Sequence, residues 1–283
     1  KAAVLNELAS SRFSVFLGPA GTGKTDVLSL RCQEPNIKKA VVLLFAPTGK
    51  ARVRMLEATD RAFPAKTLAQ FLLQHNRYDP ETGRCHRSDK DATAPAATVI
   101  VDEASMLTEV QVAALFDAVK DVKRFIFVGD PGQLPPIGAG RPLLDIATHL
   151  RPDGIEYKFP RVAPGYTELT VVRRQDGGSR RDVQFGRLFG RQTGGPAEDE
   201  VLSLMHRTDD LDHLRFVRWD EADDLRPTLL NVIVDELDLE EIDDSVGFEE
   251  SLGGTSSNGH VYFNLGNTAE KAESWQVLTP LRG

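Results

Sequence analysis

The sequence predicts an α/β fold in which a parallel sheet is flanked by helices on both faces. Four short and mainly apolar runs alternate with segments of helical periodicity in the N-terminal half; they are Phe13–Leu17, Val41–Ala46, Val99–Asp102 and Phe125–Gly129. Strands that are buried on both faces form continuous apolar runs, and alternation with helices is typical of parallel sheets. We therefore expect these four runs to be strands of one sheet.

The composition is typical of a globular protein with no membrane-spanning segment. The 283 residues are 41% hydrophobic and 27% charged, and no apolar run approaches the roughly 20 residues that a helix needs to cross a bilayer. Residues 1–10 have the pattern of an amphipathic helix and not of a secretory signal. Cys32 and Cys85 lie far apart and offer no disulfide framework, which favours a reducing compartment. We expect a cytoplasmic location and no membrane partner.

The net charge of −8 argues against a protein that coats nucleic acid without specificity, because such binding requires Lys and Arg to displace counterions. The charges are unevenly distributed, however. Carboxylates are concentrated in Asp235–Asp244, whereas basic residues cluster in Lys50–Arg54 and Arg173–Arg191. Local basic patches can therefore coexist with an acidic total.

The chain is expected to form two domains that divide near residue 152. The first covers residues 1–151 and has an insertion at about 76–97, in which Asp79–Gly83 has turn-forming residues. This insertion is either a small projecting hairpin or a plain surface loop.

The second domain is expected to cover residues 152–283 and to begin with a linker. Proline and glycine are frequent in Pro152–Gly165, which is typical of a connection between domains. A strand is predicted at Leu169–Val172 after this linker, and a last strand-like run follows at Ser274–Leu278.

A phosphate-binding loop is predicted directly after the first apolar run. The segment matches the pattern G-x-x-x-x-G-K-S/T and is followed by helical periodicity, as this motif requires. The glycines allow backbone N–H groups to surround phosphates, Lys24 would reach the β- and γ-phosphates, and Thr25 would ligate Mg²⁺. A coincidental glycine-rich turn is the alternative, and the flanking strand and helix argue against it. The residues are Gly18, Pro19, Ala20, Gly21, Thr22, Gly23, Lys24 and Thr25.

Two carboxylates at the end of the third run complete a predicted site for Mg²⁺ and a triphosphate. Asp102 would bind Mg²⁺, and Glu103 would act as the general base for an attacking water. The same five residue types recur at Val232–Glu236. In that copy, Leu225–Leu237 carries apolar residues at every fourth position, which predicts an amphipathic helix and no catalytic role.

A third polar segment, Gly129–Pro136, follows the fourth run. It holds Asp130 and Gln133 on a proline-rich turn beyond the carboxyl edge of the predicted sheet, where ligands bind in such folds. The amide of Gln133 could sense the γ-phosphate. A proline-rich turn without a functional role is the alternative.

Taken in order, these segments resemble the motifs of superfamily-one DNA helicases, and within them the RecD-like group that moves 5′ to 3′. The resemblance covers most of the chain, although residues 176–273 match only loosely. The matching segments are Gly18–Thr25, Ala46–Arg52, Lys66–Leu68, Val101–Leu107, Gly129–Pro136, Leu169–Gln175 and Gln276–Pro280.

The resemblance implies two RecA-like motor domains that bind ATP between them and single-stranded DNA across their top. Arg174 would be an arginine finger that touches the γ-phosphate, with Arg173 as the alternative that the family's Arg-Gln pair favours less. Gln133 would couple the nucleotide to the grip on DNA. The hairpin near Asp79–Gly83 lies where the family places a strand-separating pin. DNA contacts are implied for Pro47, Thr48, Lys50 and Thr67. A solvated helix face is the alternative role for the basic residues of Lys50–Arg54.

Two departures from the family pattern limit these expectations. Ala69 stands where the family usually has a histidine. The chain also ends before the family's later Thr-x-His-x-x-Gln-Gly segment, which implies a fragment with the first motor domain and part of the second. We expect an ATP- and Mg²⁺-dependent DNA helicase or translocase in repair or recombination, with partner helicase or nuclease subunits. The alternatives are a P-loop ATPase that remodels proteins and a noncatalytic, ATP-switched DNA-binding module.

Overall fold

The computed structural model describes residues 1–34, 37, 40–88, 92–171, 182, 185, 203, 213–258, 260–263 and 275. The chain forms two compact units, Lys1–Ser203 and Leu204–Gly283.

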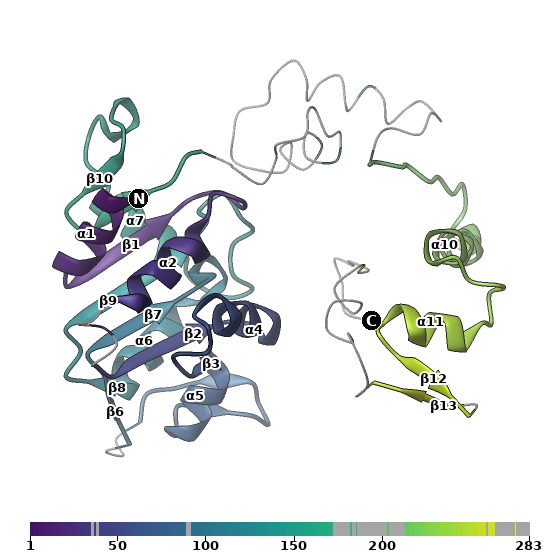
Figure 1. Cartoon of the computed structure of the whole chain (residues 1–283), viewed down its shortest axis with the longest axis horizontal. Coiled ribbons are helices and arrows are strands. Elements are labelled where there is room, and N and C mark those ends of the chain that lie inside the picture. The colour runs from purple at the N-terminus through teal and green to yellow at the C-terminus, as the bar shows by residue number, and fades with distance from the viewer. Residues whose placement is uncertain are drawn as a thin grey trace. The chain divides into compact units, whose positions relative to one another are not determined.

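The first unit is built on a seven-stranded sheet in the order β10-β11-β1-β9-β7-β2-β3 (Figure 1). Every neighbouring pair is parallel except β10 and β11. All four predicted strands are present, with ends that differ by no more than one residue from the prediction. The strands are β1 (Phe13–Leu17), β2 (Val42–Ala46), β3 (Ala65–Thr67), β7 (Thr98–Val101), β9 (Arg124–Gly129), β10 (Arg161–Ala163) and β11 (Tyr166–Glu168).

Helices cover both faces of this sheet and give the predicted α/β fold three layers (Figure 1). One core contains α1 (Ala2–Ser10), α2 (Lys24–Gln33) and α4 (Gly49–Ala58); the other contains α5 (Leu68–Gln74), α6 (Glu109–Ala118) and α7 (Pro142–Leu150). The unit also contains the short 3-10 turns η1 (Ala104–Met106) and η2 (Ile155–Tyr157) and the two-residue strands β6 (Ala94–Pro95) and β8 (Val119–Lys120).

Burial on both faces explains why the strands have no polar side. In β1, Val15 and Leu17 belong to one core, whereas Phe16 between them belongs to the other. Successive side chains of a strand point to opposite faces, so a sheet covered by helices on both sides favours apolar residues at most positions; Ser14 in β1 and Thr98 in β7 are buried polar exceptions.

The strand predicted after residue 152 is wrong in position, and the domain boundary expected there stays a prediction. Pro164 and Gly165 form the turn between β10 and β11, and Gly165 has a φ of +71°. Leu169–Val171 is not a strand, and Val172 lies outside the described residues. The cause is that β11 pairs with β1 and covers an edge that would otherwise be open, so this segment continues the first unit's sheet. The two units divide further along the chain, at Ser203 and Leu204.

The insertion after α5 contains a hairpin, which settles the alternative that the sequence left open. Strands β4 (Tyr78–Asp79) and β5 (Arg84–Cys85) are antiparallel. Asp79 accepts hydrogen bonds from the Glu81 N–H at 2.9 Å and the Thr82 hydroxyl at 2.7 Å. These bonds stabilise the turn that the sequence indicated.

The second unit contains α10 (Ala222–Leu237), α11 (Ser245–Ser251) and an antiparallel pair, β12 (Thr255–Ser257) and β13 (His260–Tyr262). The predicted helix is confirmed, because Val232–Glu236 lies inside α10 and not at a strand end. Apart from Trp275, the strand predicted at Ser274–Leu278 lies outside the described residues. The assignment of this unit to a second motor domain stays a prediction.

Within the described part of the chain, no helix combines the length and the apolar character that crossing a membrane requires.

We predict that Phe127→Ala destabilises the first unit by about 3–5 kcal/mol, the usual cost of removing a buried aromatic ring. Phe127 is 1% exposed and stacks on Phe13 with ring centroids 5.3 Å apart. The free energy of unfolding in urea measures this loss. Phe159→Ala is the matched control, because Phe159 is 82% exposed and surface changes usually cost less than about 0.5 kcal/mol. Equal losses in the two variants would contradict the described core.

Candidate functional site

A cleft of about 820 Å³ lies at the carboxyl ends of the parallel strands. The loop after β1, the start of α4, the carboxylates after β7 and the loop after β9 all line it. The sequence-predicted residues that meet in this cleft are Ala20, Gly21, Thr22, Gly23, Lys24, Thr25, Thr48, Lys50, Asp102, Glu103 and Gln133. Parallel pairing brings them together, because it puts the ends of all these strands at one edge of the sheet.

The loop between β1 and α2 needs glycine for two different reasons. Gly21 and Gly23 have φ values of +78° and +84°, a backbone region that favours glycine. Gly18 needs space instead, because a Cβ there would lie 2.8 Å from both the Leu169 carbonyl oxygen and the Thr22 hydroxyl. The Thr22 hydroxyl also donates to the Pro19 carbonyl at 2.8 Å, so the loop closes on itself.

Lys24 lies at the start of α2, with its ammonium folded over this loop. Its Nζ donates to the Gly18 carbonyl at 2.6 Å and to the Pro19 carbonyl at 3.2 Å. Thr25 is the next residue of the same helix turn. The positive end of the helix dipole, the ammonium and the hydroxyl therefore meet at one point, which is an arrangement suited to an anion.

The two carboxylates at the end of β7 have very different surroundings. Asp102 is 9% exposed. Its burial, and to a smaller extent the neighbouring Glu103 charge, raises the pKa of its carboxyl to about 6. The Glu103 N–H and Lys24 act in the opposite direction. Glu103 has a left-handed backbone, with φ 49° and ψ 38°. Such strain costs about 1–3 kcal/mol and is concentrated at functional sites.

Gln133 lines the same cleft as the loop and the carboxylates, and its strand β9 lies between β1 and β7. The Ser105 hydroxyl donates to Gln133 Oε1 at 2.9 Å. Asp130 has a structural role in this turn, since its Oδ1 accepts from the Gly132 N–H at 2.9 Å. The sequence singled out Gln133 and did not identify Ser105, although Ser105 follows Glu103 by two positions in the same motif.

The proposed DNA-contact residues lie side by side at the same edge of the sheet. Ala46 and Thr67 are register partners, so Pro47 and Thr48 follow β2 next to the end of β3. The Thr48 hydroxyl caps α4 by accepting from the Ala51 N–H at 3.2 Å.

Thr67 caps α5 in the same way, accepting from the Gln70 N–H at 3.2 Å. Each capping hydroxyl keeps its own O–H for another acceptor. Lys50 is exposed, Ala69 lies in the first turn of α5, and Arg174 lies outside the described residues.

Comparisons with known proteins relate the chain to ATP-driven machinery. A family model described as AAA domain matches residues 1–184. The ATP-dependent RecD2 DNA helicase of Deinococcus radiodurans is 31% identical over 243 residues, which cover 76% of this chain and 31% of that protein. The RecBCD enzyme subunit RecD of Mycobacterium tuberculosis is 34% identical over 158 residues, which cover 50% of this chain and 27% of that protein.

Solved structures of Pif1 helicases also align with the chain. The Bacteroides protein in complex with ADP-AlF3 and ssDNA has 19% identity and a TM-score of 0.47, covering 85% of this chain and 56% of that one. The chain spans less than a third of the length of either curated relative.

We predict that Gly18→Ala weakens nucleotide binding about tenfold or more. The added Cβ overpacks the loop at a cost of about 1–3 kcal/mol, and the loop would open to relieve it and lose its fit to the phosphates. Isothermal titration with a nonhydrolysable ATP analogue measures the change. Gly49→Ala is the matched control, since a Cβ at Gly49 meets nothing within 4 Å. Equal affinities of Gly18→Ala and the unmodified protein would contradict the role given to this close approach.

Proposed function

The chain belongs to the AAA domain family, and from this membership and the cleft we propose that it is the nucleotide-hydrolysing part of an ATP-driven DNA helicase or translocase of the RecD-like group. Membership in this family implies the use of a nucleotide. The observation that carries the proposal is the single cleft in which Lys24 faces Asp102 and Glu103, with Gln133 between their strands.

The cleft suits the phosphates of ATP together with Mg²⁺. Backbone N–H groups of Gly21–Thr25 and the Lys24 ammonium would bind the phosphate oxygens. The Thr25 hydroxyl and the Asp102 carboxylate are hard oxygen ligands, which Mg²⁺ prefers alongside phosphate. When bound, Mg²⁺ would supply positive charge to the phosphate oxygens during phosphoryl transfer. Asp102 is the better ligand of the two carboxylates, because burial fixes its place at the end of β7.

Glu103 is proposed to accept a proton from the water that attacks the γ-phosphate. Its left-handed backbone turns the chain sharply after β7 and places the side chain at the cleft. Gln133 would sense the γ-phosphate, with its amide oriented by Ser105. Arg174 would add positive charge as an arginine finger.

Single-stranded DNA is proposed to run along the carboxyl edge past α4 and α5. Pro47, Thr48, Lys50 and Thr67 would contact its backbone, the two threonines through their hydroxyls and Lys50 through its ammonium. Thr48 and Lys50 also line the nucleotide cleft, which gives the two ligands a shared wall. The names of the relatives, a DNA helicase and a subunit of the RecBCD enzyme, support this substrate and the presence of partner helicase or nuclease subunits.

A cytoplasmic location and a role in DNA repair or recombination belong to the same proposal.

The hairpin β4–β5 is the proposed strand-separating element.

ATP turnover by the full-length protein is predicted to rise with single-stranded DNA and to fall about a hundredfold or more in Lys24→Ala, because charge stabilisation at the phosphates is lost. A coupled assay of ADP release measures both effects. Lys158→Ala removes an exposed lysine outside the cleft and is expected to change nothing. Turnover that ignores DNA would favour a protein-remodelling ATPase. Equal turnover in Lys24→Ala and the unmodified protein would remove the assignment of this cleft.

Ser105→Ala is predicted to lower kcat about two- to tenfold with little change in KM, since one hydrogen bond contributes about 0.5–1.5 kcal/mol. The bond that is lost orients Gln133 and does not touch the proposed nucleotide position. Steady-state kinetics with saturating DNA separate the two constants. Ser10→Ala, at an exposed hydroxyl in α1, is the control. A change confined to KM would argue against an orienting role for Ser105.

A further inference from the structure

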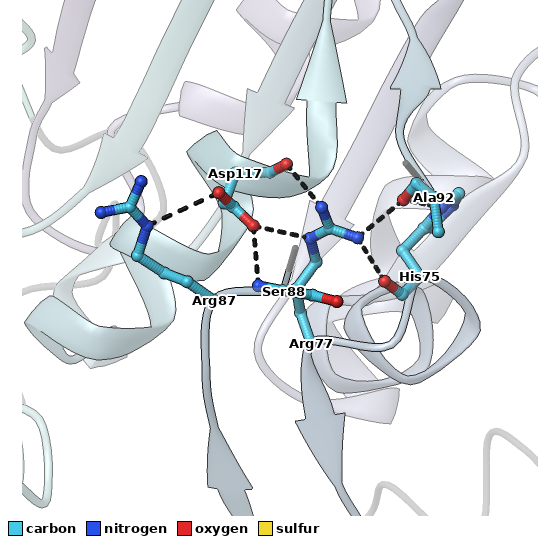
Figure 2. Close-up of polar contacts among 6 residues, drawn as sticks. All are labelled: His75, Arg77, Arg87, Ser88, Ala92 and Asp117. Atoms are coloured by element: carbon cyan, nitrogen blue, oxygen red, sulfur yellow. Dashed lines mark hydrogen bonds and ion pairs between the residues drawn. The ribbon is translucent and has the colours of Figure 1, made fainter. Parts of the chain in front are cut away.

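The hairpin β4–β5 is joined to helix α6 by one buried arginine. Arg77 lies at the base of β4, and its side chain is 2% exposed (Figure 2). Its Nε donates to Asp117 Oδ2 at 3.0 Å, and a second guanidinium nitrogen donates to the Asp117 carbonyl at 3.0 Å. We call Arg77 and Asp117 the hairpin clamp. One guanidinium therefore holds both the side chain and the backbone of Asp117 in α6.

The same two residues also hold the chain that returns from the hairpin. Arg77 donates to the Ala92 carbonyl at 2.8 Å and to the His75 carbonyl (Figure 2). Asp117 Oδ2 accepts from the Ser88 N–H at 3.1 Å. Both legs of the insertion therefore converge on the end of α6.

The clamp holds the hairpin together with the packing of Tyr78 and Cys85 against the core. Its strands have two residues each, and isolated two-stranded hairpins are marginally stable at best in water. The planar guanidinium of Arg77 uses several donors in a fixed geometry, which a single ammonium cannot do. Hydrogen bonds from Ser88 and then from Arg77 lower the pKa of the Asp117 carboxyl.

The two helices that meet at the clamp begin at the proposed functional residues. Helix α6 starts after η1, a few positions beyond Glu103, with Thr108 and Gln111 as a reciprocal cap. Helix α5 starts at the cap Thr67 and ends next to His75. Helices are stiff, and ten residues span about 15 Å. The clamp thus fixes the hairpin relative to both the nucleotide carboxylates and the proposed DNA contact.

We propose that Arg77 and Asp117 are positioning residues for DNA strand separation, which hold the hairpin as a fixed projection of the first unit. This inference rests on the proposed helicase function. A projection that separates strands must resist the force of the duplex, and a hairpin without its clamp yields to that force. Neither clamp residue lines the cleft in which ATP hydrolysis is proposed to take place.

The test compares Arg77→Lys with Arg87→Lys in the full-length protein. Both arginines contact Asp117, but the Arg87 side chain is 80% exposed and its Nε lies 3.5 Å from Asp117 Oδ1, so its loss should matter little. We expect Arg77→Lys to unwind roughly ten- to hundredfold fewer base pairs per ATP hydrolysed, because a small misplacement of a functional element can cost activity on this scale. DNA-stimulated ATP turnover should stay within about twofold of the unmodified protein, because the lining of the cleft is unchanged. Asp117→Asn, which keeps the size of the side chain, should behave like Arg77→Lys.

Hydrogen exchange at the hairpin amides distinguishes the outcomes further, and it should speed up in Arg77→Lys and Asp117→Asn but not in Arg87→Lys. Unchanged unwinding per ATP in both clamp variants would overturn the inference. A parallel loss of turnover and unwinding would also overturn it, because the clamp would then support only the fold. If the unmodified protein shows DNA-stimulated turnover without unwinding, the helicase function itself fails, and this inference fails with it.

Discussion

Parallel pairing within the first unit's sheet determines where each candidate functional residue lies. Strands β1, β9, β7, β2 and β3 end at one edge, so a loop near residue 20 and a turn near residue 133 meet although more than a hundred positions separate them. The order of the strands adds a second constraint. Because β9 lies between β1 and β7, its turn reaches the space between Lys24 and Glu103. No side-chain interaction would assemble this cleft if the strand order changed.

The cleft combines stable packing beneath it with strained or costly groups at its surface. Phe16 and Val101, directly below, are fully buried. Above them, Glu103 has a left-handed backbone and Asp102 carries a charge that burial disfavours. A bound cation and a phosphate chain would compensate part of this cost, because opposite charges offset each other most strongly where water is excluded. The rigid core thereby maintains a site that would relax in a looser fold.

A structural feature can be predicted from the sequence when its cause lies in neighbouring residues. The four central strands could be predicted almost to the residue, since burial on both faces leaves an unbroken apolar run. Strand β11, which lies between β1 and the edge strand β10, could not, because Pro164-Gly165 resembles a linker and Thr167 and Glu168 are polar. Ser105 and the hairpin clamp were missed for another reason. Their partners are 28 and 40 positions away, and a lone serine or arginine carries no signal of a distant hydrogen bond.

The start of α4 lies at both the proposed nucleotide site and the proposed DNA site. Any coupling between the two ligands through this helix must be reciprocal. Thr48 and Lys50 line the nucleotide cleft and also lie beside Thr67 at the edge assigned to DNA. If a nucleotide shifts this helix start and changes the affinity for DNA by some factor, DNA must change the affinity for nucleotide by the same factor. The hairpin lies elsewhere, because its clamp attaches it to the far ends of α5 and α6. Grip on the strand therefore depends on the starts of α4 and α5, and resistance to the duplex depends on the far ends of α5 and α6.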